Sequence, residues 1–115
     1  MRVKRVVVIG ASAGGIDALK SIVGALPNGF PLPICVVIHT APDSPGVMDE
    51  ILARAGALPA SHARSGEQMR AGHIYVAPPD HHLLVEPGVL RLSRGPRENH
   101  FRPAVDPLFR SAAQV

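Results

Sequence analysis

The sequence predicts an α/β protein built on a parallel sheet, with a β-hairpin added in its second half. Two observations support this prediction. Two β-branched apolar runs in the first half are separated by a segment with helical apolar spacing, and two segments of alternating polarity later flank a Pro-Gly pair. With 115 residues, 46% of them hydrophobic, the chain is long and apolar enough for one domain with a buried core.

The first strand and the first helix are predicted from apolar runs of different period. Val3–Ile9 is a β-branched run that stops at Gly10, which is typical of a strand buried on both faces. Gly14–Leu26 follows with helical spacing, and Pro27 ends it. The apolar face of this helix is predicted to contain Ile16, Leu19, Ile22, Val23 and Leu26.

A second strand and a second helix repeat the pattern. Pro33–Ile38 predicts another apolar strand, and His39 follows at its carboxyl end. Asp43 or Ser44 is a suitable N-cap for the next helix, and Pro45 suits its first turn. This order of elements predicts parallel strands joined by right-handed crossovers. The inner face of the second helix is predicted to contain Met48, Ile51 and Leu52.

The second half of the chain predicts short strands and a hairpin. Ala60–Arg64 and His73–Ala77 are candidates for short strands. His82–Glu86 and Val89–Ser93 alternate in polarity on either side of Pro87-Gly88, which predicts a β-hairpin.

A helix over Pro107–Val115 is predicted to close the chain. Asp106 is a suitable N-cap for it, and Pro107 suits the first helical position. The sequence carries no stop signal after this helix, so we expect the chain to be cut there rather than complete.

Composition argues against several classes of function. No uninterrupted apolar run reaches about 18 residues, so we expect no transmembrane helix and a cytoplasmic location. The net charge is +3 with dispersed arginines, which does not favour nucleic-acid binding. Cys35 is the only cysteine, and its apolar neighbours predict a buried, inert thiol. His81 and His82 would face opposite ways on a strand, and no histidine–carboxylate spacing indicates a metal site or a cofactor.

The segment from Gly10 to Gly15 lies between the first strand and the first helix, and three interpretations fit it. As a Gly-x-Ser-x-Gly turn it presents Ser12 as a nucleophile at the carboxyl edge of a sheet. As a Gly-x-Gly-x-x-Gly dinucleotide loop it has Ser12 at the middle glycine position and lacks an acidic residue at the end of the second strand. The third interpretation is a serine that only caps the helix.

The position of His39 favours the first interpretation, in which Ser12 is a nucleophile. The first two strands of a parallel βαβ unit can be neighbours, which brings Ser12 and His39 within hydrogen-bond reach at one edge of the sheet. A serine hydroxyl is a poor nucleophile near neutral pH and needs such a base. The sequence therefore predicts a Ser12 and His39 catalytic pair.

The segments that carry this pair, together with three later ones, resemble the catalytic domain of chemotaxis protein-glutamate methylesterases of the CheB type. The resemblance covers nearly the whole chain in order, and the segments are specific together rather than singly. They are Val8–Gly15, Val36–His39, Gly72–Pro78, His81–Val85 and Arg102–Ala113.

The resemblance implies a doubly wound, Rossmann-like parallel sheet in a three-layer α/β/α domain. It implies hydrolysis of glutamate methyl esters on methyl-accepting chemotaxis receptors, and in many members deamidation of receptor glutamines. The receptor is then a protein substrate, with no insertion of the chain into the membrane. Carried over residue by residue, the resemblance implies Ser12 as nucleophile, His39 as general base, and the backbone N–H groups of Ala13 and Gly14 in the oxyanion hole.

The chain also departs from the family pattern. The triad Asp of the family lies in a Gly-Met-Gly-x-Asp-Gly-like segment after a further strand, and this sequence ends before it. Asp80 lies in a proline-bounded turn and Asp106 is the expected helix cap, so neither is a suitable substitute. Ala13 replaces a common Thr, and Phe101 replaces a His. We expect residues 1–115 to be a methylesterase catalytic domain that is incomplete at its carboxyl end and has no receiver domain.

These departures keep other outcomes open. Without its orienting carboxylate a serine triad loses about 10⁴-fold in turnover, so the chain alone is expected to be feebly active or inactive. The missing strands would expose a sheet edge, which a second copy in a homo-oligomer would cover. The alternatives are an inactive fragment that only docks to receptors and, less favoured, a nucleotide-binding module. Arg102 is expected to form an ion pair with an internal carboxylate rather than contact substrate.

Overall fold

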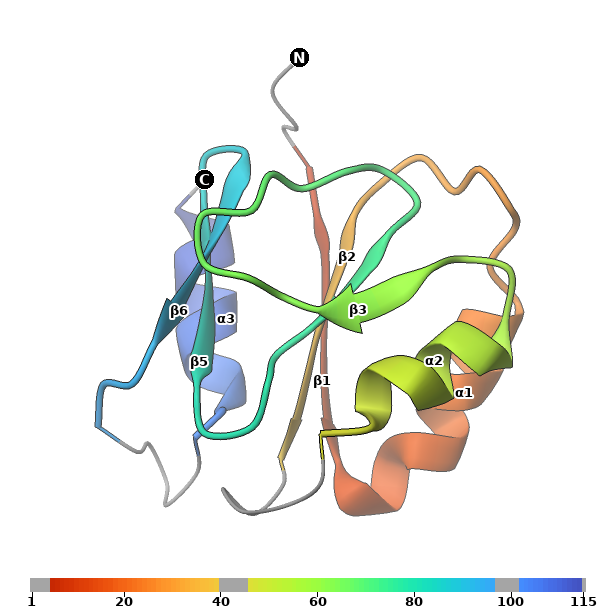
Figure 1. Cartoon of the computed structure of the whole chain (residues 1–115), viewed down its shortest axis with the longest axis horizontal. Coiled ribbons are helices and arrows are strands. Elements are labelled where there is room, and N and C mark those ends of the chain that lie inside the picture. The colour runs from red at the N-terminus through yellow and green to blue at the C-terminus, as the bar shows by residue number, and fades with distance from the viewer. Residues whose placement is uncertain (1–4, 40–45, 97–101, 115) are drawn as a thin grey trace.

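A computed structural model describes residues 5–39, 46–96 and 102–114 of the chain. Its elements follow the predicted order of strands and helices (Figure 1). In order, they are β1 (Val7–Ser12), the 3-10 turn η1 (Ala13–Gly15), α1 (Ile16–Gly24), β2 (Ile34–His39), α2 (Met48–Ala55), β3 (Ala60–His62), β4 (Ile74–Val76), β5 (His82–Glu86), β6 (Val89–Ser93) and α3 (Val105–Ala113).

The strands form a parallel sheet and a separate hairpin. The sheet has the order β1-β2-β4-β3, and β5 pairs with β6 in antiparallel orientation, so the predicted parallel sheet and hairpin are confirmed. Because the four strands are parallel, their carboxyl ends meet at one edge. We call this the carboxyl edge, and it contains the last residues of the strands: Ser12, His39, His62 and Val76.

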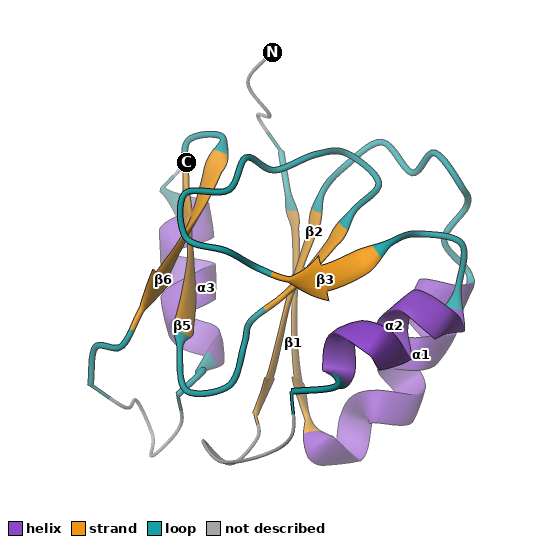
Figure 2. Ribbon diagram, viewed as in Figure 1, coloured by secondary structure: helices purple, strands orange, loops and turns teal. Residues whose placement is uncertain are grey.

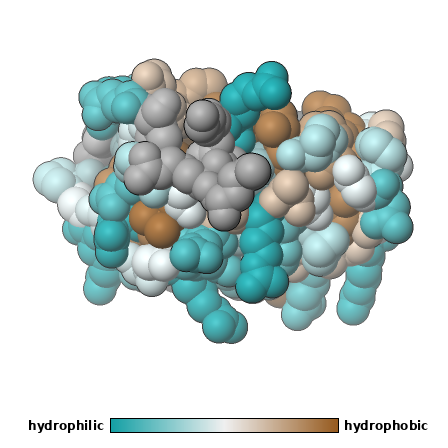
Figure 3. Space-filling view, turned by 90° about the horizontal axis from the view of Figure 1, so that it is seen from above, coloured by the Kyte–Doolittle hydropathy of each residue, from teal (hydrophilic) through white to brown (hydrophobic). Residues whose placement is uncertain are grey.

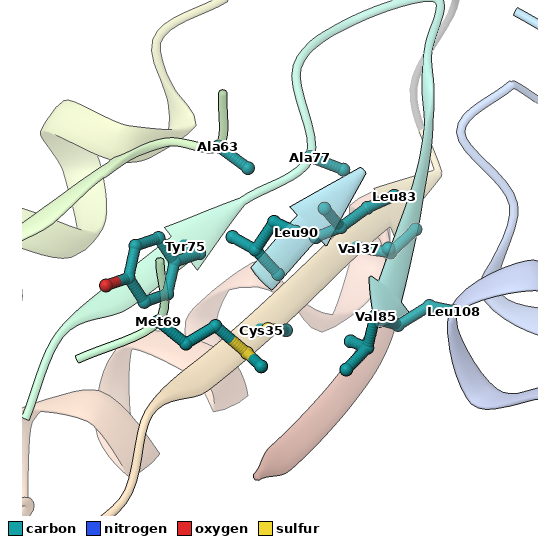
Figure 4. Close-up of a cluster of buried hydrophobic side chains, with 10 residues drawn as sticks. All are labelled: Cys35, Val37, Ala63, Met69, Tyr75, Ala77, Leu83, Val85, Leu90 and Leu108. Atoms are coloured by element: carbon teal, nitrogen blue, oxygen red, sulfur yellow. The ribbon is translucent and has the colours of Figure 1, made fainter. Parts of the chain in front are cut away.

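Helices and the hairpin cover the two faces of the sheet. The helices α1 and α2 lie on one face, and α3 with the hairpin lies on the other, which confirms the three-layer arrangement (Figure 2). On the α1 side, Leu19, Val23 and Leu52 belong to the same core as Ile34 and Val36. On the hairpin side, the core contains Cys35, Val37, Tyr75, Leu83, Val85, Leu90 and Leu108 (Figure 4).

The strand β2 is deeply buried along nearly its whole length. Its residues Ile34–Ile38 are at most 3% exposed. Burial of one such aliphatic side chain contributes about 1.5–3 kcal/mol, so packing on both faces fixes β2 and with it the position of His39. By contrast, Val7–Ile9 of β1 are only half-buried, because β1 is an edge strand among the described residues. Val8 packs into the core on the hairpin side and Val7 and Ile9 into the core on the α1 side, so the predicted packing on both faces is confirmed, although β1 is less deeply buried than β2. The predicted start of this strand at Val3 lies outside the described residues.

Helix boundaries and helix faces differ from the prediction in places. The helix α3 begins at Val105 with Ala104 as its N-cap, so Asp106 lies in the first turn and not at the cap. The Ala104 N–H donates to His82 Nδ1, a distant partner that replaces a local capping side chain. In α1, Ile22 is 51% exposed, because the helix turns Leu19 and Val23 toward the sheet. The predicted caps of α2, Asp43 and Ser44, and also Pro45, lie outside the described residues, and α2 begins at Met48.

The surface is largely polar at the end of the molecule where the strands begin. Seen from that end, hydrophilic side chains surround smaller apolar areas (Figure 3). Within the described residues, no helix combines the length and the apolar character that crossing a membrane requires.

Candidate active site

Ser12 and His39 lie directly opposite each other at the carboxyl edge. They form the last register pair between β1 and β2. Neighbouring strands lie about 4.7–4.9 Å apart, which is a separation that a serine hydroxyl and an imidazole can bridge. The predicted adjacency of the first two strands is therefore confirmed, and it brings together the two residues on which the sequence argument depended.

Strand alternation places both side chains on one face of the sheet. Val8 of β1 and both Cys35 and Val37 of β2 pack into the core under the hairpin and α3. Successive side chains alternate between faces, so Ser12 and His39 continue these rows toward the α3 side. Ser12 is exposed and His39 is half-buried. The pair therefore lies where the sheet meets solvent.

The turn after β1 holds Ser12 in an extended conformation. Its φ of −92° and ψ of 171° end the strand, and η1 then leads directly into α1. The Ser12 side chain makes no capping hydrogen bond at this helix start, which argues against the interpretation of Ser12 as a simple helix cap. A Cβ built on Gly14 would lie 3.9 Å from Ser12 Oγ, so the hydroxyl lies beside the Gly14 backbone.

The turn after Ser12 is the start of a helix, so it carries backbone N–H groups of the first helical turn. The first N–H groups of a helix have no partner within the helix. In this chain they belong to the segment that begins at Ala13 and Gly14, directly after Ser12. Donors of this kind can stabilise a negative oxygen that develops beside a helix start. The backbone arrangement is therefore compatible with the predicted oxyanion hole.

Gly10 is required by its contact with α3. A Cβ at Gly10 would lie 2.6 and 2.7 Å from the two methyl carbons of Val105, the first residue of α3. A side chain at position 10 therefore fits only if Val105 or the backbone of β1 shifts. The sequence gives no local signal for this contact, because Gly10 and Val105 are far apart along the chain.

Two aspartates, Asp80 and Asp106, were considered as possible triad members, and neither has the contacts of one. Asp80 accepts from Arg102 at 2.8 Å and from Arg94 at 2.7 Å. The hydrogen bond from Arg102 lowers the pKa of Asp80 below its ordinary value, with further lowering by the charges of both arginines. Asp106 is exposed in the first turn of α3. The ion pair also confirms the expected structural role of Arg102.

The other histidines have partners in the fold. His73 Nε2 lies 2.9 Å from Ser61 Oγ, and the His81 ring donates to the carbonyl of Pro79. His82, 4% exposed, bonds the carbonyl of Pro96 and the N–H of Ala104. Among the described residues no group of three His, Cys, Asp or Glu side chains is placed to hold a metal ion. His100 lies outside the described residues.

Fold and site together define a class: an α/β domain that presents a serine turn and a histidine at the carboxyl edge, as serine hydrolases do. The chain belongs to the CheB methylesterase family, whose model matches residues 7–115. Ser12 and His39 both lie inside the matched range, and so do all of the described strands and helices.

Individual relatives agree with this assignment. The chain is 46% identical over 109 residues to "Protein-glutamate methylesterase/protein-glutamine glutaminase 2" of Anaeromyxobacter dehalogenans, covering 95% of this chain and 32% of that protein. It is 42% identical over 114 residues to the protein of the same name from Methanospirillum hungatei, covering 96% of this chain and 32% of that protein.

A solved structure shows the same fold. The crystal structure of the Thermotoga maritima CheB methylesterase catalytic domain matches with a TM-score of 0.90 at 35% identity, covering 96% of this chain and 61% of that one. The described fold is thus that of a CheB catalytic domain, and the chain spans less than two thirds of each of these relatives.

Proposed function

We propose that Ser12 and His39 are the nucleophile and the general base of a hydrolase for glutamate methyl esters on methyl-accepting chemotaxis receptors. The observation that carries this proposal is the register pair of Ser12 and His39 at the carboxyl edge, in a chain of the CheB methylesterase family. The substrate is then a receptor protein and the location is the cytoplasm, as the sequence analysis expects.

The chemistry needs two steps on the same serine. His39 accepts the proton of Ser12 Oγ as the oxygen attacks the ester carbonyl carbon, and the backbone N–H groups of Ala13 and Gly14 stabilise the oxyanion. Collapse breaks the bond to the methoxy group, which leaves as methanol with the proton from His39. Water, deprotonated by His39, then hydrolyses the acyl-enzyme to free glutamate. With a glutamine substrate the leaving group is ammonia, and the product is again glutamate.

Neither Asp80 nor Asp106 is proposed as the carboxylate that orients His39. Asp80 is bound to two arginines, and Asp106 lies exposed on α3. A serine and histidine without an orienting carboxylate turn over about 10⁴-fold more slowly than a complete triad. Single-turnover conditions with stoichiometric protein suit the measurement, because they detect ester hydrolysis over this whole range of rates.

The experiment is methanol release from a methylated receptor, compared between the unmodified chain, Ser12→Ala and His39→Ala. Both variants should lose the release. Ser61→Ala is a matched control, because Ser61 also lies next to a histidine ring at 2.9 Å but in the middle of β3 and away from a helix start. Release that survives Ser12→Ala would contradict the proposal.

The docking alternative has its own outcome in the same assay. A chain that binds the receptor but releases no methanol at any protein concentration would favour a module that only docks. Affinity for NAD or ATP would instead support the dinucleotide interpretation of Gly10–Gly15, in which His39 occupies the place of the ribose-binding acid.

A further inference from the structure

Three chain segments are joined by the Arg102 guanidinium near the carboxyl edge. Arg102 Nε donates to Asp80 Oδ1 at 2.8 Å, and Nη2 lies 2.7 Å from the same oxygen in an ion pair. Its Nη1 donates to the carbonyls of Arg94 and Gly95, both at 3.2 Å. The side chain of Arg102 is only 15% exposed. One side chain thereby ties the loop after β4 and the end of β6 to the start of α3.

Asp80 adopts a backbone conformation that needs support. Its φ of 63° lies in the left-handed region, which is uncommon for residues other than glycine. Such a conformation persists where its surroundings determine it. Here the carboxylate is held by Arg102 and also by Arg94 at 2.7 Å. The loop that leaves β4 is therefore shaped by an ion pair rather than by a glycine.

His82 fixes the same segments from the interior. Its ring is 4% exposed, Nε2 donates to the Pro96 carbonyl at 2.8 Å, and Nδ1 accepts from the Ala104 N–H at 3.2 Å. This pair of bonds requires the neutral ring with its proton on Nε2. Two residues after Arg102, the chain is thus anchored a second time. We call Asp80, Arg102 and His82 the edge clamp.

The segment held by the edge clamp packs directly on the serine turn. Val105 follows Ala104, and its two methyl carbons would lie 2.6 and 2.7 Å from a Cβ at Gly10. Gly10 is two residues before Ser12 in the same strand. A shift of the start of α3 therefore has to move Val105 against the backbone that carries Ser12.

We propose that the edge clamp positions the serine turn: Asp80, Arg102 and His82 fix the start of α3, and Val105 transmits that position to Gly10 and Ser12. None of the three is proposed to touch substrate. The importance of the positioning for catalysis rests on the proposed role of Ser12, but the positioning itself is a statement about backbone geometry. The two are tested by different measurements on the same protein.

The test compares Arg102→Met with Arg91→Met in the full 115-residue chain. Arg91 forms an exposed ion pair with Glu86 on the hairpin at 2.9 Å, so it matches the chemistry of the change without the contact to α3. The readouts are the backbone amide resonances of Gly10–Gly15 and the rate at which a fluorophosphonate labels Ser12. We expect Arg102→Met to shift these resonances and slow labelling by about tenfold to a hundredfold, as small misplacements of a reacting group do. Arg91→Met should change neither.

Unchanged resonances of Gly10–Gly15 in folded Arg102→Met would overturn the proposal. Val105→Ala provides a second route if Arg102→Met does not fold, because it removes the methyl groups that face Gly10 and leaves the ion pair intact. It should shift the same resonances, and their constancy would also contradict the positioning. A chain whose Ser12 is never labelled, but whose turn resonances respond to both variants, would retain the edge clamp and lose the proposed catalytic function.

Discussion

Gly10 and Val105 lie so close together that a single carbon added at Gly10 would force one of the two residues to move. The distances from a Cβ at Gly10 to the Val105 methyl carbons would be 2.6 and 2.7 Å. The contact joins the strand that carries Ser12 to the helix that closes the chain. It makes the serine turn dependent on residues far away in the sequence, and it leads to the first prediction.

Gly10→Ala should destabilise the protein, because Val105 or the backbone of β1 has to move. Overpacking of this kind costs about 1–3 kcal/mol in the free energy of unfolding, measured by urea denaturation. Gly15→Ala is the control, since a Cβ there would lie 3.6 Å from Ala11 Cβ, an ordinary contact. Equal stability of the two variants would show that α3 adjusts to Gly10→Ala without strain.

Neighbouring residues of α3 should respond very differently to truncation. Leu108 is completely buried in the core under the hairpin, whereas Phe109 is 43% exposed. Leu108→Ala should lower the free energy of unfolding by about 2–5 kcal/mol, because it leaves a cavity. Phe109→Ala should cost much less in the same denaturation experiment. A larger loss from Phe109→Ala would contradict the packing of α3 described above.

The ion pair of Asp80 should make the free energy of unfolding depend on pH in the acidic range. Arg102 and Arg94 lower the pKa of Asp80 in the folded state, so the folded protein binds the proton less readily than the unfolded chain. The stabilisation is therefore complete above about pH 4, the ordinary range of an aspartate, and is lost as the pH falls through the lowered folded pKa. Asp80→Asn should be less stable than the unmodified chain at pH 7, and this difference should shrink toward pH 2. A difference that stays constant across this range would exclude the linkage.

Cys35 should resist modification until the protein unfolds. The thiol is fully buried in β2, and burial raises its pKa to about 12. Because the thiolate is the reactive form, iodoacetamide at pH 8 should leave the folded protein unmodified and alkylate it rapidly in urea. Mass spectrometry measures the extent of alkylation. Fast alkylation of the folded protein would show that β2 is less protected than its packing indicates.

Local patterns predicted the hairpin and the adjacency of Ser12 and His39. The predicted strands His82–Glu86 and Val89–Ser93 agree with β5 and β6, because alternation and the turn at Gly88, whose φ is 76°, are encoded within a few residues. The adjacency of Ser12 and His39 was predictable because each lies at the carboxyl end of one of the first two strands, and parallel strands bring such positions to one edge.

Features that depend on distant partners could not be predicted in the same way. Arg102 and Asp80 are 22 residues apart, and only the fold shows that they pair. The start of α3 was placed too late because His82 binds the Ala104 N–H, which replaces the capping side chain that a local pattern requires. Ile22 fits helical spacing but is exposed, since the sheet accepts only the narrower stripe of Leu19 and Val23.

The central claim is that Ser12, activated by His39, is the nucleophile, and the site of covalent labelling tests it most directly. The folded chain is incubated with a fluorophosphonate and digested, and the modified residue is identified by mass spectrometry. We predict an adduct on Ser12 that is lost in Ser12→Ala and strongly reduced in His39→Ala. The adduct should be unchanged in Ser61→Ala, because Ser61 lies in β3 and contacts the ring of His73 instead. An adduct on another residue, or labelling of Ser12 at the same rate in His39→Ala, would contradict the account.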